Sequence, residues 1–476
     1  MIYRFKKILQ SSVFAGLICL GGQVMAEDSD GNFIPNPATV SKISQSLSKN
    51  VEESAGLLSA WENTDVHLYE VLAETYNNNP TLLARRAEFM AVKEQLPQAQ
   101  SGFKPNVNGN ASITYAKTKT EGENFFGTEG GRTAKNIELS LEQPLFKGGS
   151  TLANIKGANA VIAAQRALTY SNEQNVMLEA VTAYVDVMLS QASLELTQNN
   201  MSLIELELRQ SQARFDVGEL TRTDVAQAKA RLALAESNLT QAKGDLNSNI
   251  ALYQEITGVA PDMDSMALPI SVLELPESKE EAMRLAELQN LSVILAENTE
   301  IAAQYDIDSV FGELLPQLSA TSSLGRDYTP YSFVDEQSSL SVGVKATLPL
   351  YQSGATRSRL RQAKQVANQR FLEVHEVKNE ARREAATNYA LWLTAKAEIK
   401  SRKAQVEAAT VAREGVQYEA EFGERTTLDT LDANQELLNA QLDLIKSKRN
   451  EVVTRFSLAK TLGILTPQNL DLYEDR

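Results

Sequence analysis

The chain has 476 residues and a net charge of −15, with 61 acidic side chains against 46 basic ones. A surface this negative repels nucleic acid and anionic lipid headgroups, which argues against a nucleic-acid-binding protein. The length allows two or three domains of ordinary size.

The N-terminus has the pattern of a secretory signal peptide. Basic residues precede a mostly apolar stretch at 8–22, and Val24-Met25-Ala26 fits a small-residue cleavage site. Cys19, the only cysteine, follows Ile18, where lipoprotein signals have Gly or Ala. We therefore expect residues 1–26 to be removed by ordinary cleavage before Glu27, leaving a chain without lipid or disulfide.

The next segment, residues 27–63, is expected to be a flexible lead or an added surface piece. Beyond it, no run of about 18 apolar residues is present, so no helix is expected to cross a membrane. A secreted chain of this kind is either soluble or spans the membrane as β-strands.

The rest of the chain contains two copies of one unit. The pattern G-E-x-T-x-x-D occurs at Gly218–Asp224 and at Gly423–Asp429, and "EQPLFKGGST" at 142–151 matches "TLPLYQSGAT" at 347–356. Each copy is expected to form a helix, a β-hairpin, a very long helix without proline and a second helix. In the first repeat (64–257) these are 67–102, 105–146, 150–217 and 221–257. In the second (279–462) they are 279–315, 316–351, 355–422 and 426–462, with a linker at 258–278 and a tail at 463–476.

Apolar residues recur along the predicted helices at steps of three, four and seven, as at Leu431, Leu438 and Ile445. This spacing is typical of coiled-coil packing between antiparallel helices. At about 1.5 Å per residue each long helix would measure roughly 100 Å, which two shorter helices laid end to end would match. The expected fold is therefore mainly α, with rods of antiparallel helices.

The predicted hairpins alternate apolar and polar residues. Val107 and Ile113 share one face in the first copy, and Leu340 and Val342 share one face in the second. About ten alternating residues suit a strand with one face on lipid and one on a polar lumen, although a soluble sheet has the same period. Four strands left open in hydrocarbon would expose unpaired backbone groups, so a membrane sheet would need strands from several chains.

The repeated seven-residue motif fits a turn between two helices. It combines a left-handed glycine just past a helix end with an N-cap threonine and an aspartate three positions later, as in a capping box. These residues are Gly218, Thr221 and Asp224 in the first copy, and Gly423, Thr426 and Asp429 in the second.

These stretches resemble the TolC-type outer-membrane channel proteins, the exit ducts of type I secretion and multidrug efflux. The resemblance is carried by "NPTL" (79–82), "RFDVGELTRTDVAQA" (214–228), "LPLYQSGA" (348–355) and "GERTTLDTLDANQEL" (423–437). It implies a homotrimer in the outer-membrane lipid, with one twelve-stranded β-barrel and a periplasmic α-barrel. It also implies two partners, a periplasmic adaptor protein and an inner-membrane ABC or RND transporter, and a girdle that includes the linker and the tail.

The resemblance also suggests a gate at the tip of the tunnel. In the family, polar bonds between neighbouring helix pairs hold the tip shut, and acidic residues ring the opening. Arg425 takes the position of the locking arginine, and Thr223 and Asp224 take the positions it bonds to. Asp429 and Asp432 take the positions of the acidic rings.

The family's gate tyrosine is absent, because Ala420 occupies its position and Tyr418 lies two residues earlier. Whether Tyr418 substitutes for it is open at this point. The tip turns themselves are candidate adaptor contacts. They comprise Gly218, Glu219, Thr221, Gly423, Glu424 and Thr426.

Little in the sequence suggests chemistry. His67 and His375 cannot build a zinc site without a mature cysteine. We find no phosphate-binding loop and no nucleophile elbow, so we expect no enzyme, cofactor or metal. Alternative classes are a trimeric coiled-coil surface stalk with a β-barrel anchor, and a diffusion porin, which would lack long helices. The cargo, a secreted protein or a small toxic molecule, is left open.

Overall fold

The computed structural model describes residues 25–27, 33–35, 66–119, 129–267, 273–331 and 334–470. The predicted signal peptide and N-terminal extension lie outside these residues, apart from β1 (Met25–Glu27), which pairs with β2 (Phe33–Pro35). The loop of the first hairpin, the middle of the linker and the end of the tail also lie outside.

Two helices of 67 residues dominate the molecule, α5 (Ser150–Asp216) and α9 (Ala355–Glu421). Each runs about 100 Å at the usual rise of about 1.5 Å per residue. The shorter helices are α2 (Val66–Asn78), α3 (Pro80–Lys93), α4 (Gln95–Gln100), α6 (Arg222–Thr257), α7 (Lys279–Gln289), α8 (Leu291–Gly312) and α10 (Thr427–Thr461), with a 3-10 turn η1 at Ser101–Phe103.

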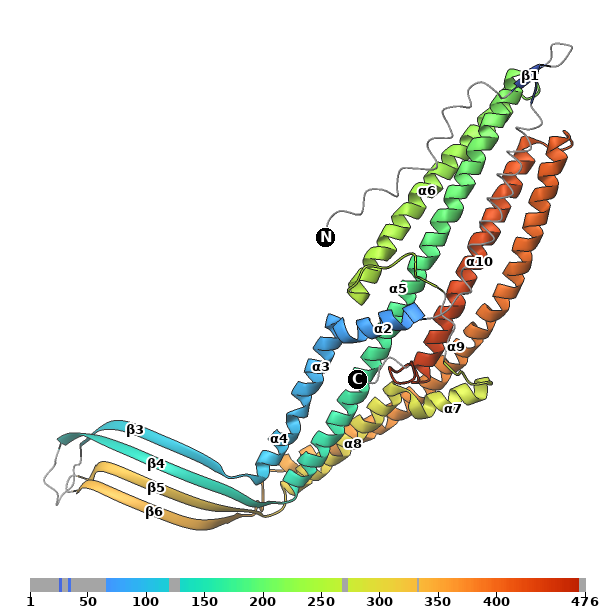
Figure 1. Ribbon diagram of the computed structural model, residues 1–476. Helices are drawn as coiled ribbons and strands as arrows, with labels where there is room; N and C mark the ends of the chain where they lie inside the picture. Colours follow the sequence, from blue (N-terminus) through green and yellow to red (C-terminus); the bar gives the residue numbers. More distant parts are fainter. Residues whose placement is uncertain are drawn as a thin grey trace.

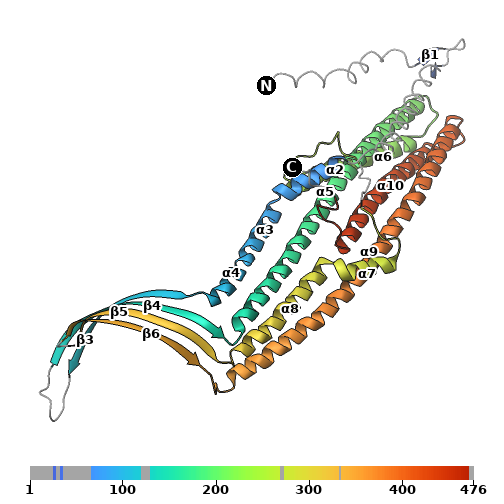
Figure 2. The same cartoon turned by 60° about the horizontal axis from the view of Figure 1, so that its bottom comes forward.

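The helices form one elongated layer. α5 packs against α6, α8 and α10, whereas α9 packs against α8 and α10. Two end-to-end stacks, α3 with α6 and α8 with α10, therefore accompany the long helices (Figures 1 and 2). The order across the layer is the α3/α6 stack, α5, the α8/α10 stack and α9. The helices α2 and α7 run across the long helices near the middle of the molecule.

The two helices that were expected to be continuous, 67–102 and 279–315, are each interrupted in the structure. Asn79 and Asn290 are the breaks: each has extended backbone and caps the next helix, with Pro80 at the first position of α3. The amide of Asn79 donates to the Ile256 carbonyl at 2.7 Å, and that of Asn290 donates to the Thr461 carbonyl at 2.8 Å. Each asparagine thus ties the start of one stacked helix to the end of the other.

A buried tyrosine holds each described part of the linker against a long helix. Tyr184 of α5 donates to the Ala267 carbonyl at 3.1 Å and accepts from the Ala267 amide at 3.0 Å. Tyr389 of α9 donates to the Glu277 carbonyl at 2.7 Å. The linker is therefore fixed to the outside of the helix layer at the level of α2 and α7, where the largest apolar core lies.

The sheet extends from the end of the helix layer away from the tip turns (Figure 1). Its strands are β3 (Asn106–Lys119), β4 (Glu129–Lys147), β5 (Gln317–Tyr331) and β6 (Val334–Thr347), antiparallel in that order. One face carries apolar side chains that stay exposed in the single chain, including Leu139, Leu324 and Leu340. Among the described residues, no helix is long and apolar enough to cross a membrane.

Candidate functional site

Two helix turns lie at the end of the molecule farthest from the sheet (Figure 1). Gly218 and Gly423 have φ angles of 84° and 77° there, the left-handed conformation predicted from the sequence. In each turn the residue after the glycine donates its backbone amide to a carbonyl near the end of the long helix. Glu219 donates to the Arg214 carbonyl at 2.9 Å, and Glu424 donates to the Glu419 carbonyl at 3.0 Å. These bonds are those of a Schellman motif, which satisfies the last carbonyls of the long helices.

Each turn then starts its second helix with a capping box. The Asp224 carboxylate accepts from the Thr221 hydroxyl at 2.7 Å and from its backbone amide at 2.9 Å. Asp429 accepts from Thr426 at the same two distances. These hydrogen bonds stabilise the ionised form and hold the pKa of both carboxyls below the usual value, mainly through the hydroxyl for Asp224 and through the backbone for Asp429. Both aspartates are thus helix caps and carry a charge at neutral pH.

Arg425 forms its ion pair within its own turn. Its Nε lies 2.8 Å from Oε2 of Glu419 at the end of α9, and both side chains are about half exposed. Thr223 and Asp224 belong to the other turn, and the described residues of this single chain show no hydrogen bond or ion pair between Arg425 and either of them. A bond from Arg425 to Asp224 therefore requires a neighbouring protomer and stays a prediction.

Asp432 connects the two helix pairs within one chain. Its carboxylate pairs with the guanidinium of Arg231 on α6, at 2.5 Å. The pair lies about two and a half turns into α6 and about one and a half turns into α10, and it is a polar contact between these two helices. Asp432, expected only as a ring residue, thus also holds the two tips together.

A buried polar group lies between α9 and α10, close to the level of Asp432. Arg413 of α9 is 6% exposed and donates to the Asn434 side chain of α10 at 3.0 Å. Glu207 of α5 faces the charge of Arg413, yet burial raises the pKa of Glu207 because desolvation outweighs that attraction. A buried charged side chain thus joins α9 to α10, and its charge also acts on Glu207 of α5.

Tyr418 makes a different contact from a gate tyrosine. Its ring packs on Phe422, with centroids 4.9 Å apart, and its side chain is 65% exposed. In the part of the chain that the structure describes, the Tyr418 hydroxyl makes no hydrogen bond. Within one protomer, Tyr418 therefore does not replace the tyrosine missing at Ala420.

The tips offer carboxylates, guanidinium groups and hydrogen-bond donors, but no reactive cluster. The described residues contain no group of three or more His, Cys, Asp or Glu side chains that could hold a metal. Such an arrangement can open, close and filter by charge, and it provides no nucleophile with an adjacent base.

Comparison with known proteins decides the family. The model of the outer membrane efflux protein family matches residues 71–258 and 282–464, which are the two repeats. The chain is 30% identical to the outer membrane efflux protein BepC of Brucella suis, over 84% of this chain and 86% of that protein. It is 25% identical to the outer membrane protein TolC of Escherichia coli, over 85% of this chain and 83% of that protein.

The chain belongs to the outer membrane efflux protein family. The fold agrees, because a crystal structure of CusC matches with a TM-score of 0.73 and 16% identity, covering 84% of this chain and 92% of CusC. The predicted TolC-like fold of two repeats is confirmed, and a trimeric barrel is consistent with these neighbours. This efflux protein is an outer-membrane channel, and the family is not one of enzymes. Nothing in the comparisons supports a structural stalk.

The sequence analysis of this efflux protein missed four residues of the tip region: Arg231, Glu419, Glu207 and Arg413. Arg231, Glu207 and Arg413 interact with residues of another helix, whereas Glu419 pairs with Arg425 in the turn that follows its own helix. In the sequence, nothing beyond ordinary alternation of charges marks Arg231 and Glu419 as contact residues. The apolar spacing around Glu207 and Arg413 could have drawn attention to them, because a charged side chain at a seam position must find a partner.

Proposed function

We propose that this efflux protein works as a homotrimeric exit duct whose periplasmic end is opened and closed by the two tip turns. A periplasmic adaptor would contact the turns, and an inner-membrane ABC or RND transporter would deliver the cargo. The channel would then conduct cargo passively across the outer membrane.

The observation that carries this proposal is that the sheet and the helix layer both have unpartnered edges in the single chain. β3 and β6 are the outer strands of the sheet, and each offers one row of backbone groups for pairing. In hydrocarbon each unpaired group costs several kcal/mol, so β3 of one copy would have to pair with β6 of the next. The helix layer has the same order, with α9 at one side and the α3/α6 stack at the other.

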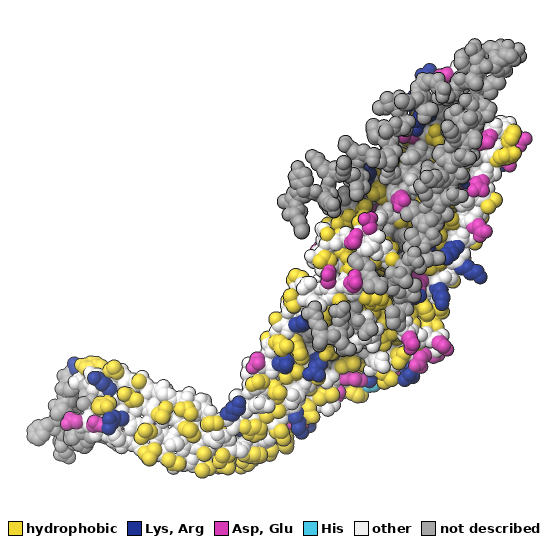
Figure 3. All heavy atoms as spheres, in the orientation of Figure 1, with side chains coloured by type: hydrophobic (Ala, Val, Ile, Leu, Met, Phe, Trp, Pro, Cys, Tyr) yellow, Lys and Arg dark blue, Asp and Glu magenta, His cyan; other side chains and the backbone are white. Residues whose placement is uncertain are grey.

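The apolar face of the sheet supports a membrane position. Val342, Leu340 and Ile113 are 79%, 72% and 73% exposed in the single chain, which a soluble protein rarely tolerates over a continuous face. Figure 3 shows hydrophobic side chains over the sheet on one face of the molecule. Three copies would supply twelve strands, within the size range of outer-membrane barrels.

The test combines mass and conductance on the same preparation. The detergent-purified mature protein should have the mass of a trimer, and it should form discrete conducting channels in a planar lipid bilayer. A stable monomer, or a trimer that never conducts, would contradict the proposed duct.

A further inference from the structure

The apolar face of the sheet ends in a row of cations. The register places Lys135 of β4 opposite Tyr328 of β5, and places Ile137 opposite Arg326. Lys135 and Arg326 therefore occupy diagonal positions on the same face, with Cα atoms about 7–8 Å apart. Lys117 of β3 lies two positions beyond Tyr115 on this face, near the end of the strand that does not connect to a helix.

This row follows directly after the apolar band. On β6 the apolar positions of the face are Leu340, Val342, Val344 and Ala346, which span about 20 Å of strand. The adjoining positions Ser338 and Glu336 are polar. The apolar band of an outer-membrane strand is about 25 Å tall, so in the proposed membrane position the cations would lie near the headgroups of the far leaflet.

Acidic side chains are placed on the opposite face at the same height. Glu138 and Asp327 lie one residue from Ile137 and Arg326, so they point to the polar side of the sheet. The row of cations, Lys117, Lys135 and Arg326, contains one acidic residue on the same face, Glu336, whose carboxylate lies 2.7 Å from Arg326. Lys135 forms no ion pair among the described residues and is exposed. Although the whole chain is negative, this row is net positive.

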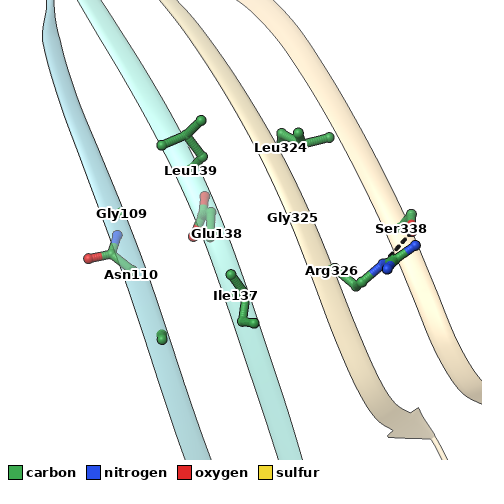
Figure 4. Close-up of a pocket in the computed structure, with 10 residues that line it drawn as sticks. Gly109, Asn110, Ile137, Glu138, Leu139, Leu324, Gly325, Arg326 and Ser338 are labelled. Carbon is green, nitrogen blue, oxygen red and sulfur yellow. Dashed lines mark hydrogen bonds between the residues drawn. The ribbon is translucent and has the colours of Figure 1, made fainter.

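A shallow hollow lies beside the row. It measures about 490 Å³, and its lining includes Ile137, Leu139, Leu324 and Arg326, Gly109 on the neighbouring strand, and one acidic residue, Glu138. Figure 4 shows Arg326 of β5 reaching Ser338 of β6 at the edge of the hollow, with Leu324 farther along β5 and Leu139 on the neighbouring β4. The missing side chain of Gly109 keeps the hollow open, since a Cβ there would meet nothing within 4 Å.

We propose that this face binds a phosphorylated, multiply acylated glycolipid of the outer leaflet, with an acyl chain in the hollow and a phosphate on Lys135 and Arg326. The proposal rests on the proposed membrane position of the sheet. Clusters of basic residues at the membrane surface attract anionic headgroups, and guanidinium groups match phosphate geometry. The far leaflet is the one these cations would reach, because the helices occupy the periplasmic side.

The experiment uses the purified trimer and lipid A that carries both phosphates. Native mass spectrometry should show lipid A retained by the wild-type trimer, and Lys135→Gln with Arg326→Gln should weaken retention about tenfold. Lys135→Gln alone should weaken it less and serves if the double variant does not fold. Lys345→Gln, which removes an exposed cation from the polar face of β6, should leave retention unchanged.

Two further variants separate the acyl and phosphate contacts. Gly109→Leu fills the hollow without altering any charge and should also weaken retention. Glu336→Gln frees Arg326 from its ion pair and should strengthen it. Equal retention of dephosphorylated lipid A, or equal retention by the double variant, would overturn the proposal, as would displacement of the lipid by inorganic phosphate at equal concentration.

Conductance measured on the same samples keeps the two proposals apart. A protein that forms trimeric channels but retains no lipid A disproves the lipid site alone. A protein that forms no channel disproves the duct and, with it, the membrane position on which the lipid site depends.

Discussion

Arg231 and Asp432 are 201 residues apart in the chain, yet their side chains form an ion pair between the two helix pairs just above the tip turns. Arg231 belongs to the first repeat and Asp432 to the second. The contact therefore resists any movement that separates α6 from α10, which is the movement that would widen the periplasmic end.

The Arg231→Ala variant should open more readily than the wild type. A partly exposed pair is worth up to about 1 kcal/mol, and three copies in a trimer would act together, so we expect a several-fold rise in the open fraction of single channels. The exchange Arg231→Asp with Asp432→Arg should restore the wild-type value. Arg209→Ala removes an exposed arginine from α5 and serves as the control. If the exchange variant stays as open as Arg231→Ala, the pair does not hold the tips together.

Arg425 and Asp224 should meet only between protomers. The mature chain is expected to have no cysteine, so Arg425→Cys with Asp224→Cys introduces two thiols whose pairing can be traced. Oxidation should give cross-linked dimers and trimers on denaturing gels, because the single chain keeps these residues in separate turns. Thr223→Cys with Arg425→Cys should behave alike. An internal cross-link with no change in molecular mass would contradict a contact between protomers.

Arg425→Ala and Asp224→Ala should each raise conductance with little loss of trimer. Arg425→Ala frees Glu419 as well, whereas Asp224→Ala also removes a helix cap, which costs about 1 kcal/mol of helix stability. Arg222→Ala removes an exposed arginine two residues from Asp224 in the first tip turn and is the control. Unchanged conductance in both variants would leave the two residues as local stabilisers of the turns.

Asn79 and Asn290, the capping asparagines at the two helix breaks, should matter for stability and not for gating. Asn79 is 7% exposed, caps α3 and ties it to α6, so Asn79→Ala should cost about 1–3 kcal/mol through the lost cap and the unpaired carbonyl. The neighbouring exposed Asn78→Ala should have almost no effect. Thermal unfolding followed by circular dichroism measures both. Equal stability of the two variants would show that the stacked helices hold together without the capping asparagine.

Much of this fold could be predicted because its rules are local. The left-handed Gly218 and Gly423, the capping boxes and the alternation of the strands depend on residues a few positions apart. The helix break at Asn79 also has a local signal, the Asn-Pro pair, although the sequence analysis predicts one continuous helix there. At Asn290 no proline marks the break.

The side-chain contacts between helices could not be predicted in the same way. Arg231 meets Asp432, and Arg413 meets Asn434, because of how neighbouring helices are rotated about their axes. Heptad spacing shows which face of a helix is apolar, but it does not show which polar residue at the border of that face finds a partner. The trimer and the roles of the gate residues came from the family resemblance.

Glu207 should make stability depend on pH. Its folded-state pKa is raised above the ordinary value of 4.5, so the folded state binds this proton more tightly than the unfolded state. The contribution to stability is fully present below pH 4.5 and is lost as the pH rises through the folded-state pKa. Glu207→Gln should therefore dissociate and unfold at a higher temperature than the wild type at neutral pH. Below the unfolded-state pKa the two should coincide.

The control for this pH dependence is Glu205→Gln, which removes an exposed carboxylate from the same helix. Its difference from the wild type should be small at every pH. A Glu207→Gln variant that is less stable at neutral pH would mean that attraction to Arg413 outweighs the cost of desolvation.

The aspartates at the tips should govern ion selectivity. Asp429 stays ionised because Thr426 stabilises its charged form, and Asp432 keeps a second oxygen beyond its pair with Arg231. In a trimer these carboxylates would line a narrow opening, where their field attracts cations. Asp429→Asn with Asp432→Asn should therefore weaken cation selectivity and block by polyvalent cations, measured as reversal potentials in salt gradients.

The Arg231→Ala variant gives the decisive contrast, because it opens the tips while leaving Asp432 unpaired. It should raise conductance and increase cation selectivity together. If the double variant keeps its selectivity and cation block, Asp429 is a helix cap and Asp432 a structural ion pair, and neither lines the opening.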